Sequence, residues 1–255
     1  MKSTSSLLHS AWKKLIGAYL FFFGLSAIAG FLLVTAFHLQ PESLYQVSTK
    51  RLSYAFPVFQ LGVSMGLDLG VLIFLWNTVA ALLTVSFLYS VSWFDPYQAR
   101  EPNRLIRRIF SSKTRMKLLC YLPGCAKIEQ ESVRRAYVWL MVPLLGMILL
   151  GIESGIAVST GMHLLGSFLP ALVSLAPHGL IEIPVLALAG AVPFSAHLLL
   201  KRNSPATAAM AVFQQVSRYR NALPIKGIVC LVVAGLFVAG WVEAHVTTQM
   251  IKGLM

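Results

Sequence analysis

The chain has 255 residues, of which 57% are apolar and 12% are charged, and its mean hydropathy is +0.73. A soluble domain carries about 25% charged residues, so this chain lacks the polar surface that would cover a globule in water. The net charge of +12 does not indicate nucleic acid, because the basic residues gather between apolar runs, as in membrane proteins. We therefore predict an all-α, polytopic transmembrane helix bundle that forms one domain over residues 1–255.

Five apolar runs long enough to cross a bilayer follow one another along the chain. We expect the spans at about 15–37, 67–93, 136–159, 178–200 and 225–245. Between the first two runs, residues 38–66 contain Pro41 and Pro57 and are predicted to form a loop, with an interfacial part as an open alternative. Residues 163–176 are too few for a span, so we expect a re-entrant or interfacial helix there.

A further helix is expected between the fourth and fifth spans. Ser204 and Pro205 resemble a helix cap followed by proline in the first turn. Apolar residues then recur at helical spacing beside Arg218 and Arg220, which predicts an amphipathic helix on the inner membrane surface. The apolar positions are Met210, Phe213, Val216 and Tyr219.

The distribution of positive charge predicts the orientation. With five spans and the N-terminus inside, 18 of the 21 basic residues lie on the cytoplasmic side, ten of them in the loop at 95–135. Lys50, Arg51 and Lys252 fall outside. The positive-inside rule thus predicts a multi-pass cell-membrane protein with a cytoplasmic N-terminus and an extracytoplasmic C-terminus.

Several ionisable residues are expected in the outer third of the membrane, judged from a rise of 1.5 Å per helical residue. They are Asp68, Glu153, His163, Glu182, Glu243 and His245. Charges at this depth are costly and usually face a bundle interior. Ordinary hydration of helix ends accounts for Asp68, Glu243 and His245 taken singly. It accounts less well for Glu153 and Glu182, which have apolar neighbours on both sides.

The most informative motif is His-Gly-x-x-Glu at the start of the fourth span. His178 and Glu182 are four residues apart and share one helix face. Pro177 favours the first turn, which places His178 at the positive end of the helix and disfavours its protonation. A neutral imidazole and a carboxylate can form a metal pair, an acid/base pair, or a pair that only hydrogen-bonds to itself.

His178 and Glu182 are therefore the candidate catalytic residues. A metal site needs a third ligand, for which Glu153 and His163 lie at a suitable height. Zinc or another divalent metal is the cofactor that this set would hold. His197 lies about 22 Å from Glu182 along a helix and is a poor ligand.

Three other polar or small residues are expected to have structural roles. Asn77 lies in mid-span, where asparagine usually bonds to a neighbouring helix. Gly179 would allow another backbone to approach closely, and Pro184 removes a helical hydrogen bond and predicts a kink.

The segment Pro177-His178-Gly179-Leu180-Ile181-Glu182-Ile183-Pro184, followed by Ala189-Gly190, resembles the signature of the stage II sporulation protein M family. A weaker match is Asn77 with the stretch from Thr78 to Leu83. The five-span layout is also similar to that family. The sequence departs from it in the basic stretch at 95–135, at Val192-Pro193, and at Glu153.

The resemblance implies an integral membrane protein that acts as a scaffold or partner in envelope remodelling, or in peptide export and maturation. Two alternatives remain open: an intramembrane metal-dependent hydrolase or peptide-maturation enzyme, and a transporter component using the acidic layer. We expect membrane lipid and other membrane or envelope proteins as partners, a homo-oligomer as an open alternative, and no nucleic acid.

Overall fold

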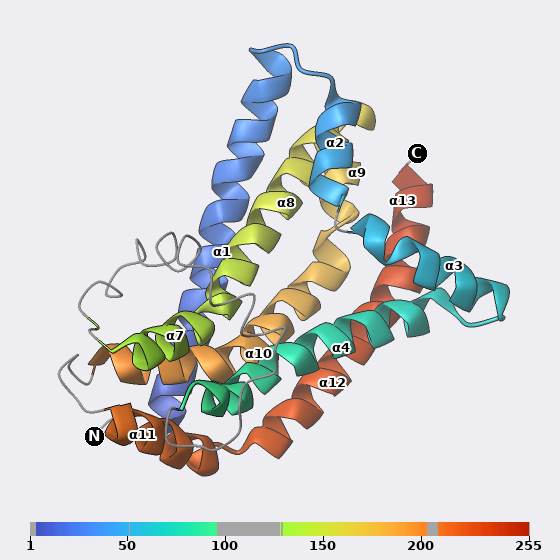
Figure 1. Cartoon of the computed structure of the whole chain (residues 1–255). Helices are drawn as coiled ribbons and strands as arrows, with labels where there is room; N and C mark the ends of the chain where they lie inside the picture. Colours follow the sequence, from blue (N-terminus) through green and yellow to red (C-terminus); the bar gives the residue numbers. More distant parts are fainter. Residues whose placement is uncertain (1–3, 51, 96–127, 129, 203–208, 255) are drawn as a thin grey trace.

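A computed structural model describes residues 4–50, 52–95, 128, 130–202 and 209–254 (Figure 1). Every element in these ranges is a helix, and five helical segments are long and apolar enough to cross a membrane. The first is α1 (Thr4–Thr35), and the second is α4 (Leu69–Ser90) with η2 (Val91–Phe94). The third joins α7 (Glu131–Trp139) to α8 (Val142–Leu164), and the fourth joins α9 (Phe168–Val173) to α10 (Ala176–Arg202). The fifth is α12 (Ile225–Trp241) with the π-helical turn η4 (Val242–Thr247).

Each of the five predicted spans corresponds to a helical segment long and apolar enough to cross a membrane, and the ends of these segments differ from the predicted bounds at particular places. α1 begins at Thr4 rather than at about Leu15. Its 32 residues measure about 48 Å at 1.5 Å per residue, longer than the bilayer core, so its first turns extend beyond the apolar zone. The third span is interrupted at Leu140 and Met141, and Pro143 lies in the first turn of α8.

The prediction that residues 38–66 form a loop is wrong, because most of this segment is helical. The segment forms α2 (Pro41–Thr49), η1 (Leu52–Tyr54) and α3 (Phe56–Ser64). Pro41 and Pro57 occupy the first turns of α2 and α3, where a missing N–H leaves no helical hydrogen bond unmade. The prolines therefore start helices here instead of preventing them.

α10 is the central helix of the bundle. In the apolar stretch of its span 61% of the residues are buried within the protein, against 22–33% in the other four spans. One side packs on α1 and α8 around Leu15, Tyr19, Met147 and Phe194. Another side contributes Ala189, Val192 and Ala196 to a second core shared with α4, α7, α11 (Ala209–Ala222) and α12. α10 runs as one helix through both Pro184 and Pro193, and the Pro184 carbonyl accepts a hydrogen bond from Trp12 Nε1 at 2.9 Å.

Small residues bring α1 and α8 into direct backbone contact. A Cβ atom on Gly151 would lie 2.6 Å from the Tyr19 carbonyl oxygen, and one on Gly155 would meet Ser26 and the Phe23 carbonyl. Ser26 Oγ also donates to the Gly151 carbonyl at 3.3 Å. Small residues are how membrane helices approach closely without a hydrophobic driving force between them.

The predicted amphipathic helix is present as α11, and its cap at Ser204-Pro205 lies outside the described residues. Phe213, Val216 and Tyr219 are buried as expected, but Met210 is 51% exposed and Val212 takes its place. The buried face packs on α7 and α10. α11 is therefore packed as part of the bundle.

The described charges separate along the bundle. α7, α11 and the start of α1 lie at one end, and α2, α9 and α13 (Thr248–Leu254) lie at the other (Figure 1). Eight of the lysines and arginines whose side chains are described belong to the first end: Lys13, Lys14, Arg134, Arg135, Lys201, Arg218, Arg220 and Lys226. We call it the basic end. Most of the basic loop at 95–135 falls outside the described residues.

Candidate functional site

Three ionisable side chains converge at the end of the bundle opposite the basic end. His178, Glu182 and Glu243 each offer one potential ligand atom, and these atoms lie within 4.8 Å of one another. His178 is 8% exposed and both glutamates are half-buried. We call these residues the His–Glu–Glu cluster; among the described residues it is the one group of this kind.

His178 and Glu182 reach the cluster from the first two turns of α10. Their spacing of four residues places both on one face, as the sequence predicts. His178 Nδ1 lies 3.4 Å from Thr247 Oγ1 in η4. If the hydroxyl accepts from Nδ1–H, the lone pair of the imidazole is on Nε2.

Asn77 confirms the prediction of a bond between helices. Its Nδ2 atom donates to Glu182 Oε1 at 2.9 Å, so α4 and α10 are joined through a cluster carboxylate. The amide restricts the orientation of that carboxylate without neutralising its charge. Asn77 is therefore a positioning residue for Glu182.

Glu243 is supplied by η4, the π-helical turn that ends the fifth span. Single π turns inside α-helices often occur at functional sites. In this turn Glu243 belongs to the cluster, Thr247 approaches His178, and His245 faces α4. One turn of six residues thus presents three polar groups to two other helices.

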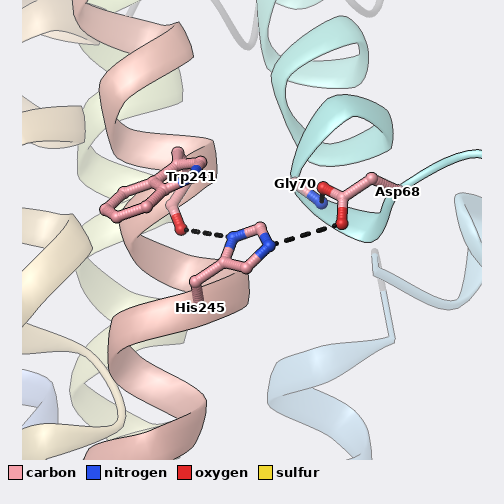
Figure 2. A network of polar contacts seen from close by, with 4 residues as sticks. All are labelled: Asp68, Gly70, Trp241 and His245. Carbon is pink, nitrogen blue, oxygen red and sulfur yellow. Dashed lines mark hydrogen bonds and ion pairs between the residues drawn. The ribbon is translucent and has the colours of Figure 1, made fainter.

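A second polar contact lies beside the cluster (Figure 2). His245 Nε2 is 3.4 Å from Asp68 Oδ2, and His245 Nδ1 donates to the Trp241 carbonyl at 3.1 Å. Asp68 caps α4 by accepting from the Gly70 N–H at 2.8 Å. A Cβ atom on Gly240 would lie 2.8 Å from the Gly70 carbonyl oxygen, so α4 and α12 touch through backbone here.

Glu153 and His163, the proposed third ligands, are not part of the cluster. Both lie on α8, which packs mainly on α1 and α2, whereas the cluster forms where α10 meets α4 and η4. The His163 ring stacks on Phe31 with 5.6 Å between centroids. Their predicted height along the helix does not bring them to the same side of α10.

His197 lies near the other end of α10 from the cluster and is buried in the core of the bundle. It is 4% exposed, its Nδ1 contacts the Tyr137 carbonyl at 3.0 Å, and its ring stacks on Phe194. The expected close backbone approach at Gly179 is wrong. A Cβ there would meet only the Leu175 side chain, at an ordinary 3.6 Å.

The sequence alone did not select Glu243 over the other acidic residues. Hydration of a helix end explained its position, and nothing in the spacing predicted a π turn. A clue in the sequence is the predicted depth of Glu243 in the membrane, because Glu182 and Glu243 are expected at similar levels on consecutive antiparallel spans.

Comparison with known proteins decides the family. The family model described as stage II sporulation protein M matches residues 18–248. The chain belongs to this family. The match includes all of α4, α10 and the fifth span and most of α1, so the His–Glu–Glu cluster and Asn77 lie within the region that matches the sporulation protein M family. Neither the curated proteins nor the solved structures contain a match.

Proposed function

We propose that this multi-pass protein of the stage II sporulation protein M family is a membrane scaffold that holds a partner during envelope remodelling or peptide export and maturation. The observation that carries the proposal is α3, a short helix whose apolar side chains are mostly left uncovered. Phe56, Val58, Leu61 and Val63 are 52–63% exposed.

α3 is fixed to the bundle by one side only. Gly62 contacts the Leu72 side chain of α4, and Phe59 packs edge-on against Trp76, with 6.2 Å between ring centroids. The helix extends sideways from the bundle next to the start of α4 (Figure 1). It therefore presents an apolar face at a defined place, which is what a docking element for another membrane protein requires.

The polar contacts described above support the same role, because they hold the start of α4 in register with its neighbours. Asn77 ties α4 to α10, and Asp68 ties the α4 cap to η4. The position of α3 depends on α4. The charge distribution favours a cytoplasmic basic end, which would place α3 and the His–Glu–Glu cluster at the extracytoplasmic side.

Photocrosslinking tests the scaffold. A photoreactive amino acid replaces Leu61 in α3 or, as the matched control, Leu231 in α12; the two are 63% and 61% exposed. In native membranes we expect a defined protein adduct from position 61 and lipid adducts alone from position 231. Lipid adducts alone at both positions would overturn the proposal.

A metal-dependent hydrolase or peptide-maturation enzyme is the second candidate, and the His–Glu–Glu cluster is the observation that favours it. Three protein ligands with one position left open is the usual composition of a catalytic zinc site. Such an enzyme predicts that Glu182→Gln abolishes maturation of a partner peptide in cells, while a pure scaffold retains it. A transporter using the acidic layer predicts ion flux in liposomes that Glu182→Gln and Glu153→Gln abolish.

A further inference from the structure

The geometry points to a divalent-cation site formed by His178, Glu182 and Glu243. The ion that it would bind is a borderline metal of the zinc class. The donor set is one imidazole nitrogen and two carboxylate oxygens, contributed by α10 and η4. Imidazole and carboxylate together suit zinc and its neighbours, whereas magnesium and calcium prefer oxygen alone. This inference is independent of the scaffold proposal.

The spacing of the donor atoms is close to what a metal needs. Ligands at about 2.0–2.2 Å from zinc stand about 3.5 Å apart in a tetrahedral site. The three atoms here lie within 4.8 Å of one another. Side-chain rotation can shorten the distances between the donor atoms by about 1 Å, which would close the site around an ion without moving a helix.

The electrostatics favour a cation at this point. Glu182 and Glu243 lie close enough for their charges to interact, and both are half-buried at one end of the apolar spans. Two ionised carboxylates at this separation repel, and the cost grows as water is removed. Asn77 is a neutral donor to Glu182 and leaves that repulsion in place. A divalent ion, or a proton on one carboxyl group, relieves it.

The surroundings resemble the supporting contacts of known metal sites. Ligating histidines usually bond through the second ring nitrogen, and ligating carboxylates are usually hydrogen-bonded. Thr247 Oγ1 lies beside His178 Nδ1, and Asn77 bonds to Glu182. These two contacts leave Nε2 of the imidazole and one oxygen of Glu182 for an ion. A proton shared by two carboxyl groups would not require the imidazole to join them.

Metal content of the purified chain tests the site. The full chain, without a histidine tag, is purified in detergent and analysed by mass spectrometry for metals. It is then stripped with a chelator and titrated with Zn²⁺ and with Co²⁺, whose visible absorption reports imidazole and carboxylate ligation. We expect about one ion per chain and a tetrahedral or five-coordinate Co²⁺ spectrum.

Isosteric variants locate the ion. Glu243→Gln and Glu182→Gln should each weaken Zn²⁺ binding by at least about tenfold, since loss of a ligand exceeds the 10–100-fold effect of an outer partner. Glu153→Gln is the matched control, a half-buried glutamate on α8 outside the cluster, and should leave binding unchanged. Thermal unfolding in detergent checks that each variant is folded.

Two results would overturn the site. One is a wild-type chain that holds no metal after purification and takes none up in either titration, which would leave a protonated carboxyl pair as the explanation of the cluster. The other is a folded Glu243→Gln variant that binds Zn²⁺ as tightly as the wild type. Neither result bears on the crosslinking test at Leu61, so the scaffold and the metal site can fail separately.

Discussion

Asn77 Nδ2 donates to Glu182 Oε1 at 2.9 Å, and this bond joins the middle of α4 to the second turn of α10. Replacing Asn77 with leucine keeps the apolar character of the span and removes the bond. We expect a loss of about 0.6 kcal/mol of unfolding free energy, and no more than about 1.7 kcal/mol, the range measured for bonds between membrane helices. Unfolding in mixed detergent micelles measures this loss.

The control for Asn77→Leu is Thr84→Ala on the same helix. Thr84 Oγ1 donates to the Ala80 carbonyl within α4, so the loss of this bond breaks no hydrogen bond between helices. Equal effects from the two substitutions would show that the Asn77 bond contributes nothing beyond its own helix.

The contact of Asp68 with His245 should give a small coupling energy between the start of α4 and η4. His245 Nε2 lies 3.4 Å from Asp68 Oδ2, and Nδ1 donates to the Trp241 carbonyl. Both side chains are more than a third exposed, so water screens the pair. A double-mutant cycle with Asp68→Asn and His245→Gln should give a coupling of about 0.2–1 kcal/mol, typical of exposed pairs. A coupling of zero would show that this contact does not hold the start of α4 to η4.

Much of the fold follows from the sequence because bilayer thickness constrains it. Apolar runs of sufficient length located all five spans, and helical periodicity located Phe213, Val216 and Tyr219 on the buried face of α11. The shared face of His178 and Glu182 follows from their spacing alone. These features depend on neighbours in the sequence.

Features that depend on which helices are neighbours could not be predicted in the same way. Glu153 and Glu243 have similar heights, yet only Glu243 meets Glu182, because η4 packs on α10 while α8 turns most of its surface to α1. The sequence also does not predict helices α2 and α3, because Pro41 and Pro57 favour a loop at these positions. A proline pattern alone does not distinguish a turn from the first turn of a helix.

The interface between α1 and α8 should be the most sensitive to added side-chain volume. A Cβ atom on Gly155 would collide with Ser26 and with the Phe23 backbone, and backbone cannot move aside cheaply. Gly155→Ala should therefore lower the unfolding free energy by about 1–3 kcal/mol, the usual cost of overpacking. Gly146→Ala is the matched control on the same helix, because its Cβ position has nothing within 4 Å beyond its chain neighbours and the backbone of its own helix. Equal stability of both variants would contradict the close approach.

Cysteine labelling in intact cells checks the orientation. Ser5 is exposed in the first turn of α1, at the basic end, and Lys252 is exposed in α13 at the other end. In a chain whose three native cysteines are replaced by serine, we expect an impermeant maleimide to label Lys252→Cys directly. Ser5→Cys should be labelled only after permeabilisation, because five spans place the two ends on opposite sides and positive charge stays inside. The reverse labelling pattern would show that the protein has the opposite orientation, with α3 and the His–Glu–Glu cluster at the cytoplasmic face. Labelling of both sites from outside would require an even number of spans.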